Sequence, residues 1–159
     1  MADAGPRSAA PSEHKSEEGL QEMLEYGDNI DPATFEQILE MDEDDASREF
    51  SRGIVFGFFE QAEATFEKMD DNLTKRDLAQ LSSLGHFLKG SSATLGLTKV
   101  KDSCEKIQWY GMHKDDNGAN DEPSDDVCLK RIKDALTEAK KDYQDVEKAL
   151  KAYYDGLDA

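Results

Sequence analysis

The sequence predicts an all-α protein: an up-and-down four-helix bundle with an additional short N-terminal helix. Apolar residues recur at intervals of three and four along four long segments, which is the spacing of amphipathic helices. Turn-forming and capping residues separate these segments. No segment alternates between apolar and polar residues as a half-buried β-strand would. Long helices joined by short loops favour antiparallel packing around one core.

The N-terminal end is predicted to hold a tail and one short helix. Residues 1–27 are rich in Ala, Ser, Gly, Pro and Glu and contain few large apolar residues. This composition is typical of a disordered acidic tail, with at most a short helix at residues 20–26. Asp31 and Pro32 then suit the N-cap and the first position of a helix that extends to about residue 41. We therefore predict a bundle domain over residues 28–159.

Two long helices are predicted before Gly96. The first covers about residues 46–70 and has an apolar stripe along its length. The second is predicted to follow Thr74, because Thr is a favoured N-cap and an acidic residue stands three positions later. It is predicted to end near Leu95, where Gly96 fits a helix stop.

Two further helices complete the predicted bundle. Thr98 is expected to cap a helix that extends to about His113. Residues 114–123 are polar and predict a loop. Ser124 is then expected to cap a long last helix, whose apolar residues alternate steps of three and four in the manner of a bundle helix.

The charge of the chain narrows the classes of partner. Its 36 acidic residues against 19 basic ones give a formal net charge of −17. Such a chain repels nucleic acid backbones and anionic lipid headgroups, so soluble proteins are the better candidates as partners. The alternative is that the charge only keeps the protein soluble. No apolar run approaches the roughly 20 residues of a membrane span, and the first residues lack the apolar core of a secretory signal.

The cysteine and histidine content predicts neither disulfides nor metal. With no export signal, Cys104 and Cys128 are expected to be reduced thiols in a cytoplasmic and nuclear monomer, with Cys104 in the core. The three histidines, His14, His86 and His113, are far apart and show no metal-ligand spacing. The chain also contains no Gly-rich phosphate loop, so we expect no ATP site and no cofactor.

The helix around His86 has an unusual polar face. Its leucines fall on one arc of the helix, and His86 falls nearly opposite that arc, so its ring is predicted to face solvent. Apart from one lysine, the residues three, four and seven positions from His86 are all small: Ala79, Ser82, Ser83, Gly90 and Ala93. Glycine inside a helix costs about 1 kcal/mol relative to alanine. Its presence one turn from His86 leaves room for another molecule to approach the ring.

These features suit phosphoryl transfer. Imidazole is largely neutral near pH 7, since its reference pKa is about 6.5, and a ring nitrogen can attack phosphorus and leave again. Lys89, one turn away, can place its ammonium group beside the phosphoryl oxygens, whose charge grows during transfer. The alternative is that His86 is an ordinary exposed histidine and Gly90 a packing glycine.

The stretch His86-Phe-Leu-Lys-Gly-Ser-Ser resembles the His-x-x-Lys-Gly-[Ser/Ala] motif of histidine-containing phosphotransfer (HPt) domains. The flanking sequences extend the resemblance to fungal members of the Ypd1 type. They are the run from Leu84 to Leu97, the segment Cys104-Glu-Lys-Ile-Gln108, and Met41-Asp-Glu-Asp-Asp45 before Phe50-Ser-Arg-Gly53. The resemblance covers about residue 30 to the C-terminus.

The resemblance implies roles for four residues. In that family the motif histidine is phosphorylated, which corresponds to His86, and the motif lysine and glycine correspond to Lys89 and Gly90. A glutamine on the following helix, near the histidine, corresponds to Gln108. The helical spacing of Gln108 at the rim of an apolar stripe agrees with this role, although an ordinary solvated glutamine has the same spacing.

The resemblance also implies partners. Family members exchange phosphoryl groups with receiver domains of a hybrid histidine kinase and of response regulators, which dock on an apolar patch beside the histidine. Candidate contacts here are Phe87, Phe35, Ile38 and Ser83, each of which could equally be structural. For Phe50, beside the predicted short helix, we expect a core position.

Three hypotheses follow from the sequence. The first is a phosphorelay intermediate that accepts a phosphoryl group on His86 from one receiver domain and passes it to an aspartate of another. The second is an acidic interaction module that never carries phosphate. The third is an autokinase or phosphatase, which is disfavoured because no nucleotide motif and no acid–base pair accompany His86.

Overall fold

The computed structural model describes residues 29–42 and 48–158, except for the side chains of the last two residues. These residues form five helices and no strand beyond one isolated bridge pair. The helices are α2 (Pro32–Glu40), α3 (Glu49–Thr74), α4 (Leu78–Thr94), α5 (Thr98–Tyr110) and α6 (Asp125–Asp158). None of them is long and apolar enough to cross a membrane. The predicted tail and the helix at 20–26 lie outside the described residues.

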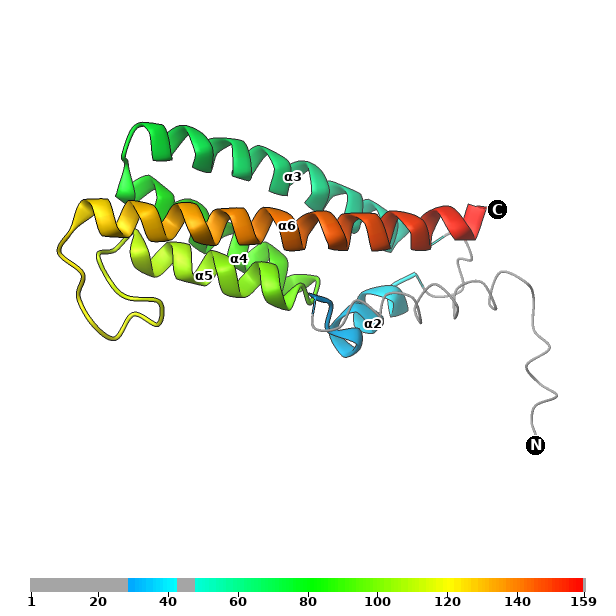
Figure 1. The fold of residues 1–159 in the computed structure, drawn as a ribbon. Helices are drawn as coiled ribbons and strands as arrows, with labels where there is room; N and C mark the ends of the chain where they lie inside the picture. Colours follow the sequence, from blue (N-terminus) through cyan, green and yellow to red (C-terminus); the bar gives the residue numbers. More distant parts are fainter. Residues whose placement is uncertain (1–28, 43–47, 159) are drawn as a thin grey trace.

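Helices α3 to α6 form the bundle. They lie side by side, and α2 lies beyond one end of α4 and α5, beneath the C-terminal half of α6 (Figure 1). Each bundle helix packs against the next along the chain, and α6 returns to pack against α3. The prediction of an up-and-down four-helix bundle with an additional short helix is therefore confirmed.

Two contacts fix α2 to the end of the bundle. The backbone N–H of Asp31 donates to the carbonyl of Gly96, in the α4–α5 turn, at 2.7 Å. The ring of Phe35 meets the ring of Tyr153, near the end of α6, edge-on with centroids 6.4 Å apart. Such edge-to-face pairs add about 0.5–1.5 kcal/mol beyond burial. The short helix thus closes the core at the C-terminal end of α6.

A buried carboxylate anchors the start of α3. Asp42 precedes the helix in the chain, and its side chain accepts hydrogen bonds from the backbone N–H of Ser51 at 2.8 Å and from the Ser51 hydroxyl at 2.7 Å. The Tyr154 hydroxyl of α6 donates to the Ser51 oxygen at 2.8 Å. Because Ser51 lies in the first turn, Asp42 satisfies a backbone donor that the helix itself cannot. This network joins the α2–α3 connection to α6.

Several predicted helix boundaries are confirmed. Asp31 and Pro32 occupy the N-cap and first position of α2. The Ser124 hydroxyl accepts from the backbone N–H of Val127 at 3.2 Å and so caps α6. Gly96 ends the α4 segment with a φ of +74°, a conformation that favours glycine.

The predicted cap at Thr74 is wrong. Helix α3 continues through Thr74, whose hydroxyl donates to the carbonyl of Asp70 within the helix at 3.3 Å. The N-cap of α4 is Asp77, which accepts from the backbone N–H of Gln80 at 3.0 Å. Leu97, rather than Thr98, is the N-cap of α5.

Close backbone contact characterises the packing of α4 on α5. A Cβ at Gly85 of α4 would lie 2.8 Å from the carbonyl oxygen of Cys104 and 2.9 Å from the backbone nitrogen of Gln108. A Cβ at Gly111, just after α5, would lie 2.7 Å from the carbonyl oxygen of Leu78. Neither position can hold a larger residue without separating the helices. Cys104, predicted to be in the core, is fully buried between them, and this burial raises the pKa of its thiol to about 12.

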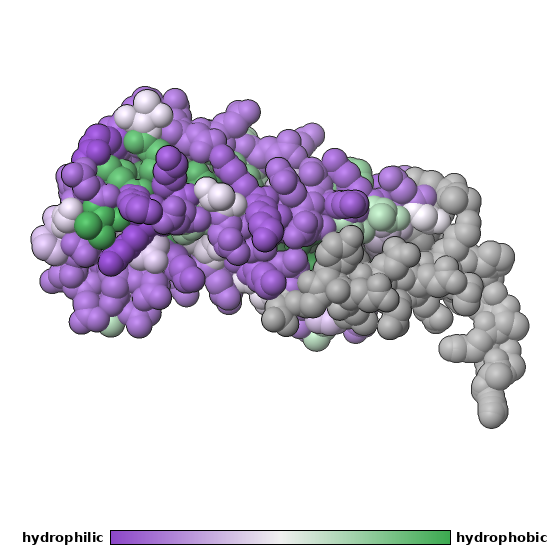
Figure 2. Space-filling model, in the orientation of Figure 1, coloured by the Kyte–Doolittle hydropathy of each residue, from purple (hydrophilic) through white to green (hydrophobic). Residues whose placement is uncertain are grey.

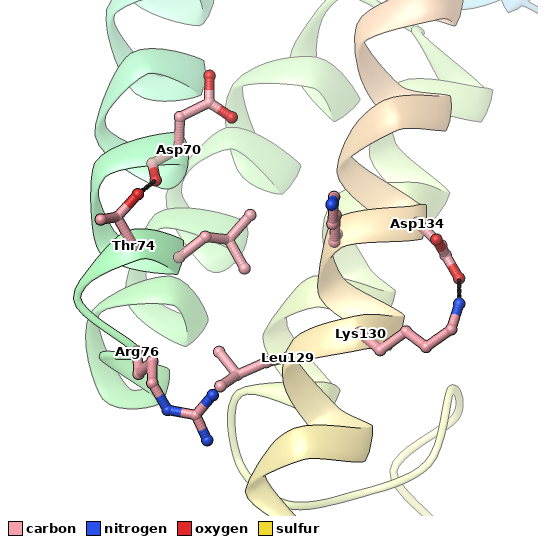
Figure 3. Close-up of a pocket in the computed structure, with 8 residues that line it drawn as sticks. Asp70, Thr74, Arg76, Leu129, Lys130 and Asp134 are labelled. Carbon is pink, nitrogen blue, oxygen red and sulfur yellow. Dashed lines mark hydrogen bonds and ion pairs between the residues drawn. The ribbon is translucent and has the colours of Figure 1, made fainter.

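A cleft of about 730 Å³ lies between α3 and α6. Figure 2 shows apolar surface between the polar rims of these two helices. In Figure 3, Arg76, just after α3, extends toward Leu129 of α6, while Lys130 and Asp134 lie on the side of α6 that is turned away from α3. Four of the charged residues that line the cleft form ion pairs: Asp70 with Lys140 at 2.7 Å, Lys130 with Asp134 at 3.1 Å, and Arg76 with Asp126 at 2.6 Å. His86 does not line this cleft.

Candidate functional site

His86 lies in the middle of α4 with its side chain exposed, as the helical pattern predicts. On the opposite face Leu81 and Leu88 are completely buried, and Leu95 is 1% exposed. The histidine therefore contributes no apolar contact to the core. Its ring is accessible to another molecule.

One flank of His86 faces α5. Each residue turns a helix by about 100°, so Ser82 and Lys89 lie on the same side of His86, toward the contact point at Gly85. The Ser82 hydroxyl donates to the backbone carbonyl of Gln108 at 2.9 Å. The Lys89 ammonium lies 3.7 Å from a carboxylate oxygen of Glu105. Two residues of α5 one turn apart are thus tied to α4 just below and just above His86.

Gln108 brings an unpaired acceptor to this flank. Its side-chain Oε1 is buried and has no hydrogen-bond partner among the described residues. A buried acceptor without a partner costs about 1–3 kcal/mol, and a role in a functional site is one reason why a protein retains such a group. The backbone of Gln108 lies against Ser82 and Gly85 of α4, and the approach of its side chain to His86 stays a prediction.

The other flank of His86 is open. Ser83, Phe87 and Gly90 lie on this side, toward α3, and all three are exposed. A Cβ added at Gly90 would meet nothing within 4 Å. Phe87 is 47% exposed and presents a large apolar side chain beside His86.

A shallow groove between α3 and α4 continues from this open flank. Its volume is about 410 Å³, and its walls are formed by Gly53, Ile54, Gly57, Phe58, Gln61, Ser91, Thr94 and Leu95. Phe50, 53% exposed, lies one turn before Ile54 on the same stripe of α3. The groove has a bare backbone at Gly53 and Gly57, where an added Cβ would meet nothing within 4 Å.

Three of the predicted partner contacts and core positions need correction. Phe35 and Ile38, candidate docking residues, are 1% and 6% exposed and belong to the core. The ring of Phe35 points from α2 toward Tyr153 of α6. Phe50, expected in the core, is instead exposed beside the groove. Phe87 and Ser83 are exposed next to His86, and their role as partner contacts stays a prediction.

Comparisons with known proteins agree with this geometry. The Hpt domain model matches residues 54–142. The chain is 44% identical to multistep phosphorelay regulator 1 of Schizosaccharomyces pombe over 134 residues, which cover 84% of this chain and 45% of that protein. It is 35% identical to the phosphorelay intermediate protein YPD1 of Candida albicans over 187 residues, covering 88% of this chain and 100% of that protein.

Solved structures give the same result. The Saccharomyces cerevisiae histidine phosphotransfer signaling protein Ypd1, crystallised with the receiver domain of its downstream response regulator Ssk1, matches with a TM-score of 0.69 and 33% identity. The match covers 80% of this chain and 95% of that one. A crystal structure of yeast Ypd1p alone matches with a TM-score of 0.70 and 29% identity over the same shares of the two chains. This chain belongs to the family of histidine-containing phosphotransfer (Hpt) domain proteins.

Proposed function

We propose that this protein is a phosphorelay intermediate. His86 accepts a phosphoryl group from the aspartyl phosphate of a hybrid sensor kinase's receiver domain and passes it to the receiver aspartate of a response regulator. The observation that carries the proposal is the exposed ring of His86, with an ammonium group on one flank and an open glycine surface on the other. The names of the fungal relatives support the same role.

The transfer needs no nucleotide on this protein. An unprotonated ring nitrogen of His86 attacks phosphorus, the N–P bond forms, and the P–O bond to the donor aspartate breaks so that a carboxylate leaves. Onward transfer runs the same steps in reverse on a second aspartate. The proton on the other ring nitrogen stays in place, so neutral imidazole is both the nucleophile and the leaving group. A metal is supplied, where needed, by the receiver's own aspartate site.

Each flank of His86 has its own task. Lys89 places positive charge beside the equatorial oxygens of the transferring phosphoryl group, where negative charge is spread. Gly90 leaves the in-line path to the ring free, since reacting atoms must approach within roughly 3–3.5 Å. The unpaired Gln108 Oε1 is an acceptor for an N–H of the imidazole, which would hold the ring in one orientation.

The receiver domain is proposed to dock along the groove between α3 and α4. The exposed rings of Phe87 and Phe50 stand near its two ends, and Ser83 lies on the same flank of His86. An apolar centre with a polar rim is the usual make-up of a protein interface. The bare backbone at Gly53 and Gly57 lets a partner's side chains come close to α3.

Replacing His86 by Gln tests the proposal. Wild-type protein mixed with a phosphorylated receiver domain is expected to gain acid-labile phosphate, and His86→Gln is expected to gain none. The free energy of unfolding of the variant should stay within about 0.5 kcal/mol of the wild-type value, because a solvent-exposed side chain contributes little to stability.

Incubation with ATP alone separates the competing hypotheses. The proposed carrier takes up no label from ATP without a phosphorylated receiver. Label from ATP alone would reveal an autokinase. Receiver binding without any phosphate on the wild-type protein would leave the interaction module as the better hypothesis.

A further inference from the structure

The ion pair between Lys89 and Glu105 joins α4 to α5 on the flank of His86. The ammonium nitrogen and the carboxylate oxygen lie 3.7 Å apart, and the two side chains are 25% and 45% exposed. Among the described residues, Glu105 is the ion-pair partner of Lys89. The lysine proposed to stabilise the phosphoryl group is therefore already occupied by a carboxylate in the phosphate-free protein.

The packing of α5 keeps Glu105 in this place. Gly85 holds the backbone of α5 against α4, because even a methyl group there would lie 2.8 Å from the Cys104 carbonyl oxygen. The Ser82–Gln108 hydrogen bond fixes the rotation of α5 one turn from Glu105. The carboxylate cannot withdraw from the site by a movement of its helix without breaking these contacts.

From this geometry we infer that Glu105 is a positioning residue that competes with the phosphoryl group for the ammonium group of Lys89. The inference rests on the proposed function of His86. When phospho-His86 forms, its oxygens and the Glu105 carboxylate both attract the same cation. Glu105 forms or breaks no covalent bond and transfers no proton; the ammonium group of Lys89 exchanges one ionic partner for another.

The consequence of this competition is a less stable phospho-His86. Any free energy that the Lys89–Glu105 pair contributes must be given up before Lys89 can pair fully with the phosphoryl group. A partly exposed ion pair is worth about a two- to fivefold change in an equilibrium constant. Glu105 would thus keep the phosphoryl group on His86 easier to pass on, which is what an intermediate between two aspartates requires.

The first test measures the equilibrium between phospho-His86 and a phosphorylated receiver domain. Glu105→Gln is expected to shift this equilibrium about two- to fivefold toward phospho-His86. Asp134→Asn is the matched control, since it removes the same charge from an exposed ion pair on α6, and it should leave the equilibrium unchanged. An equilibrium that Glu105→Gln leaves unchanged, or shifts toward the receiver, overturns the inference.

A double-mutant cycle tests whether Glu105 acts through Lys89. In a Lys89→Ala background the carboxylate has no ammonium group to compete for, so Glu105→Gln should produce less than half of its effect on the wild-type background. An equal effect in both backgrounds would mean that the carboxylate acts only through its own charge, and the inference that it competes for Lys89 would be wrong.

The second test needs no receiver domain. Phosphoramidate, a small phosphoryl donor, is used to load His86, and the second ionisation of the phosphoryl group is followed by ³¹P NMR. Release of Lys89 in Glu105→Gln should lower the phosphoryl pKa by about 0.3–0.7 units, which corresponds to the same two- to fivefold change. An unchanged phosphoryl pKa overturns the inference. Loading by phosphoramidate but not by a receiver would instead overturn the proposed function, while the NMR result still decides the role of Glu105.

Discussion

At the scale of single residues, Gly90 lies one helical turn after His86, and its lack of a side chain leaves open space beside the imidazole ring. Glycine lowers the stability of a helix interior, and nothing within 4 Å of its Cβ position explains why a larger residue is absent. The packing therefore does not require glycine here, in contrast to Gly85. The approach of a partner to His86 gives the missing reason.

Replacing Gly90 by Gln should separate function from stability. The new side chain would extend over the neighbouring ring and obstruct in-line approach of the aspartyl phosphate, so the rate of phosphoryl transfer is expected to fall by orders of magnitude. The free energy of unfolding should hold or rise by up to about 1 kcal/mol, because the helix gains a better helix former. Stopped-flow or quench-flow transfer assays and thermal melting measure the two effects.

Gly90→Ala is the control for this prediction, since it gives the same relief to the helix without a long side chain. It should transfer at close to the wild-type rate. Normal transfer by Gly90→Gln would show that the open flank does not serve to admit a partner. Unfolding of Gly90→Gln would show that Gly90 is a packing glycine after all.

At the scale of helices, the contact between α4 and α5 sets the surroundings of His86. Gly85→Ala should destabilise the protein by about 1–3 kcal/mol, because the added methyl meets the backbone of α5 at 2.8 Å and backbone atoms cannot rotate away. Urea denaturation measures the loss. Gly90→Ala, on the same helix but in open space, should lose no stability, because alanine is the better helix former and its methyl group meets nothing. A similar loss in both variants would show that the close contact at Gly85 is not its cause.

The sequence predicts this bundle well where periodicity decides the structure. The leucines of α4 identify its buried face, and His86 is predicted to be exposed because it lies opposite them. This prediction requires no information about the neighbouring helices. Gly96 and Ser124 are also found in the predicted roles, because their conformations depend on the adjacent backbone.

Prediction fails where distant contacts decide the structure. Thr74 and Asp77 are both acceptable caps, but α3 continues through Thr74, so the carboxylate of Asp77 is the one that caps α4. Phe35 is buried because its ring packs against Tyr153, which is 118 positions away in the sequence and lies at the end of the bundle. The exposure of Phe50 and the Glu105–Lys89 pair likewise depend on how neighbouring helices are rotated, which no single helical stripe contains.

At the scale of the whole molecule, the formal net charge of −17 makes every buried carboxylate expensive. Asp142 of α6 is only 6% exposed. Burial, followed by the charge of Glu138, raises the pKa of Asp142 above its usual value, while Lys99 lowers it by a smaller amount. The charged form of this carboxyl is therefore less favourable in the folded protein than in the unfolded chain.

Asp142→Asn is accordingly expected to stabilise the protein at pH 7 and to raise its Tm by about 1–4 °C. The sign follows from linkage: the folded state binds the proton of Asp142 more tightly than the unfolded chain, so ionisation of this carboxyl destabilises the fold as pH rises. The penalty is complete above the raised pKa of the folded state and is lost below the ordinary carboxyl pKa of about 3.9. The gain from the asparagine should therefore shrink as pH falls through this window and vanish near its lower end.

Melting curves from pH 3 to pH 8, collected side by side for wild type, Asp142→Asn and Asp134→Asn, measure this dependence. Asp134 is 68% exposed, so its replacement changes the net charge equally but removes no buried carboxylate. If relief of the overall negative charge were the cause, the two variants would gain the same stability. A gain in stability that is confined to Asp142→Asn and disappears in acid would show that the burial of this one carboxylate destabilises the fold. Because α6 carries no proposed catalytic group, phosphoryl transfer to His86 should be unaffected by the substitution.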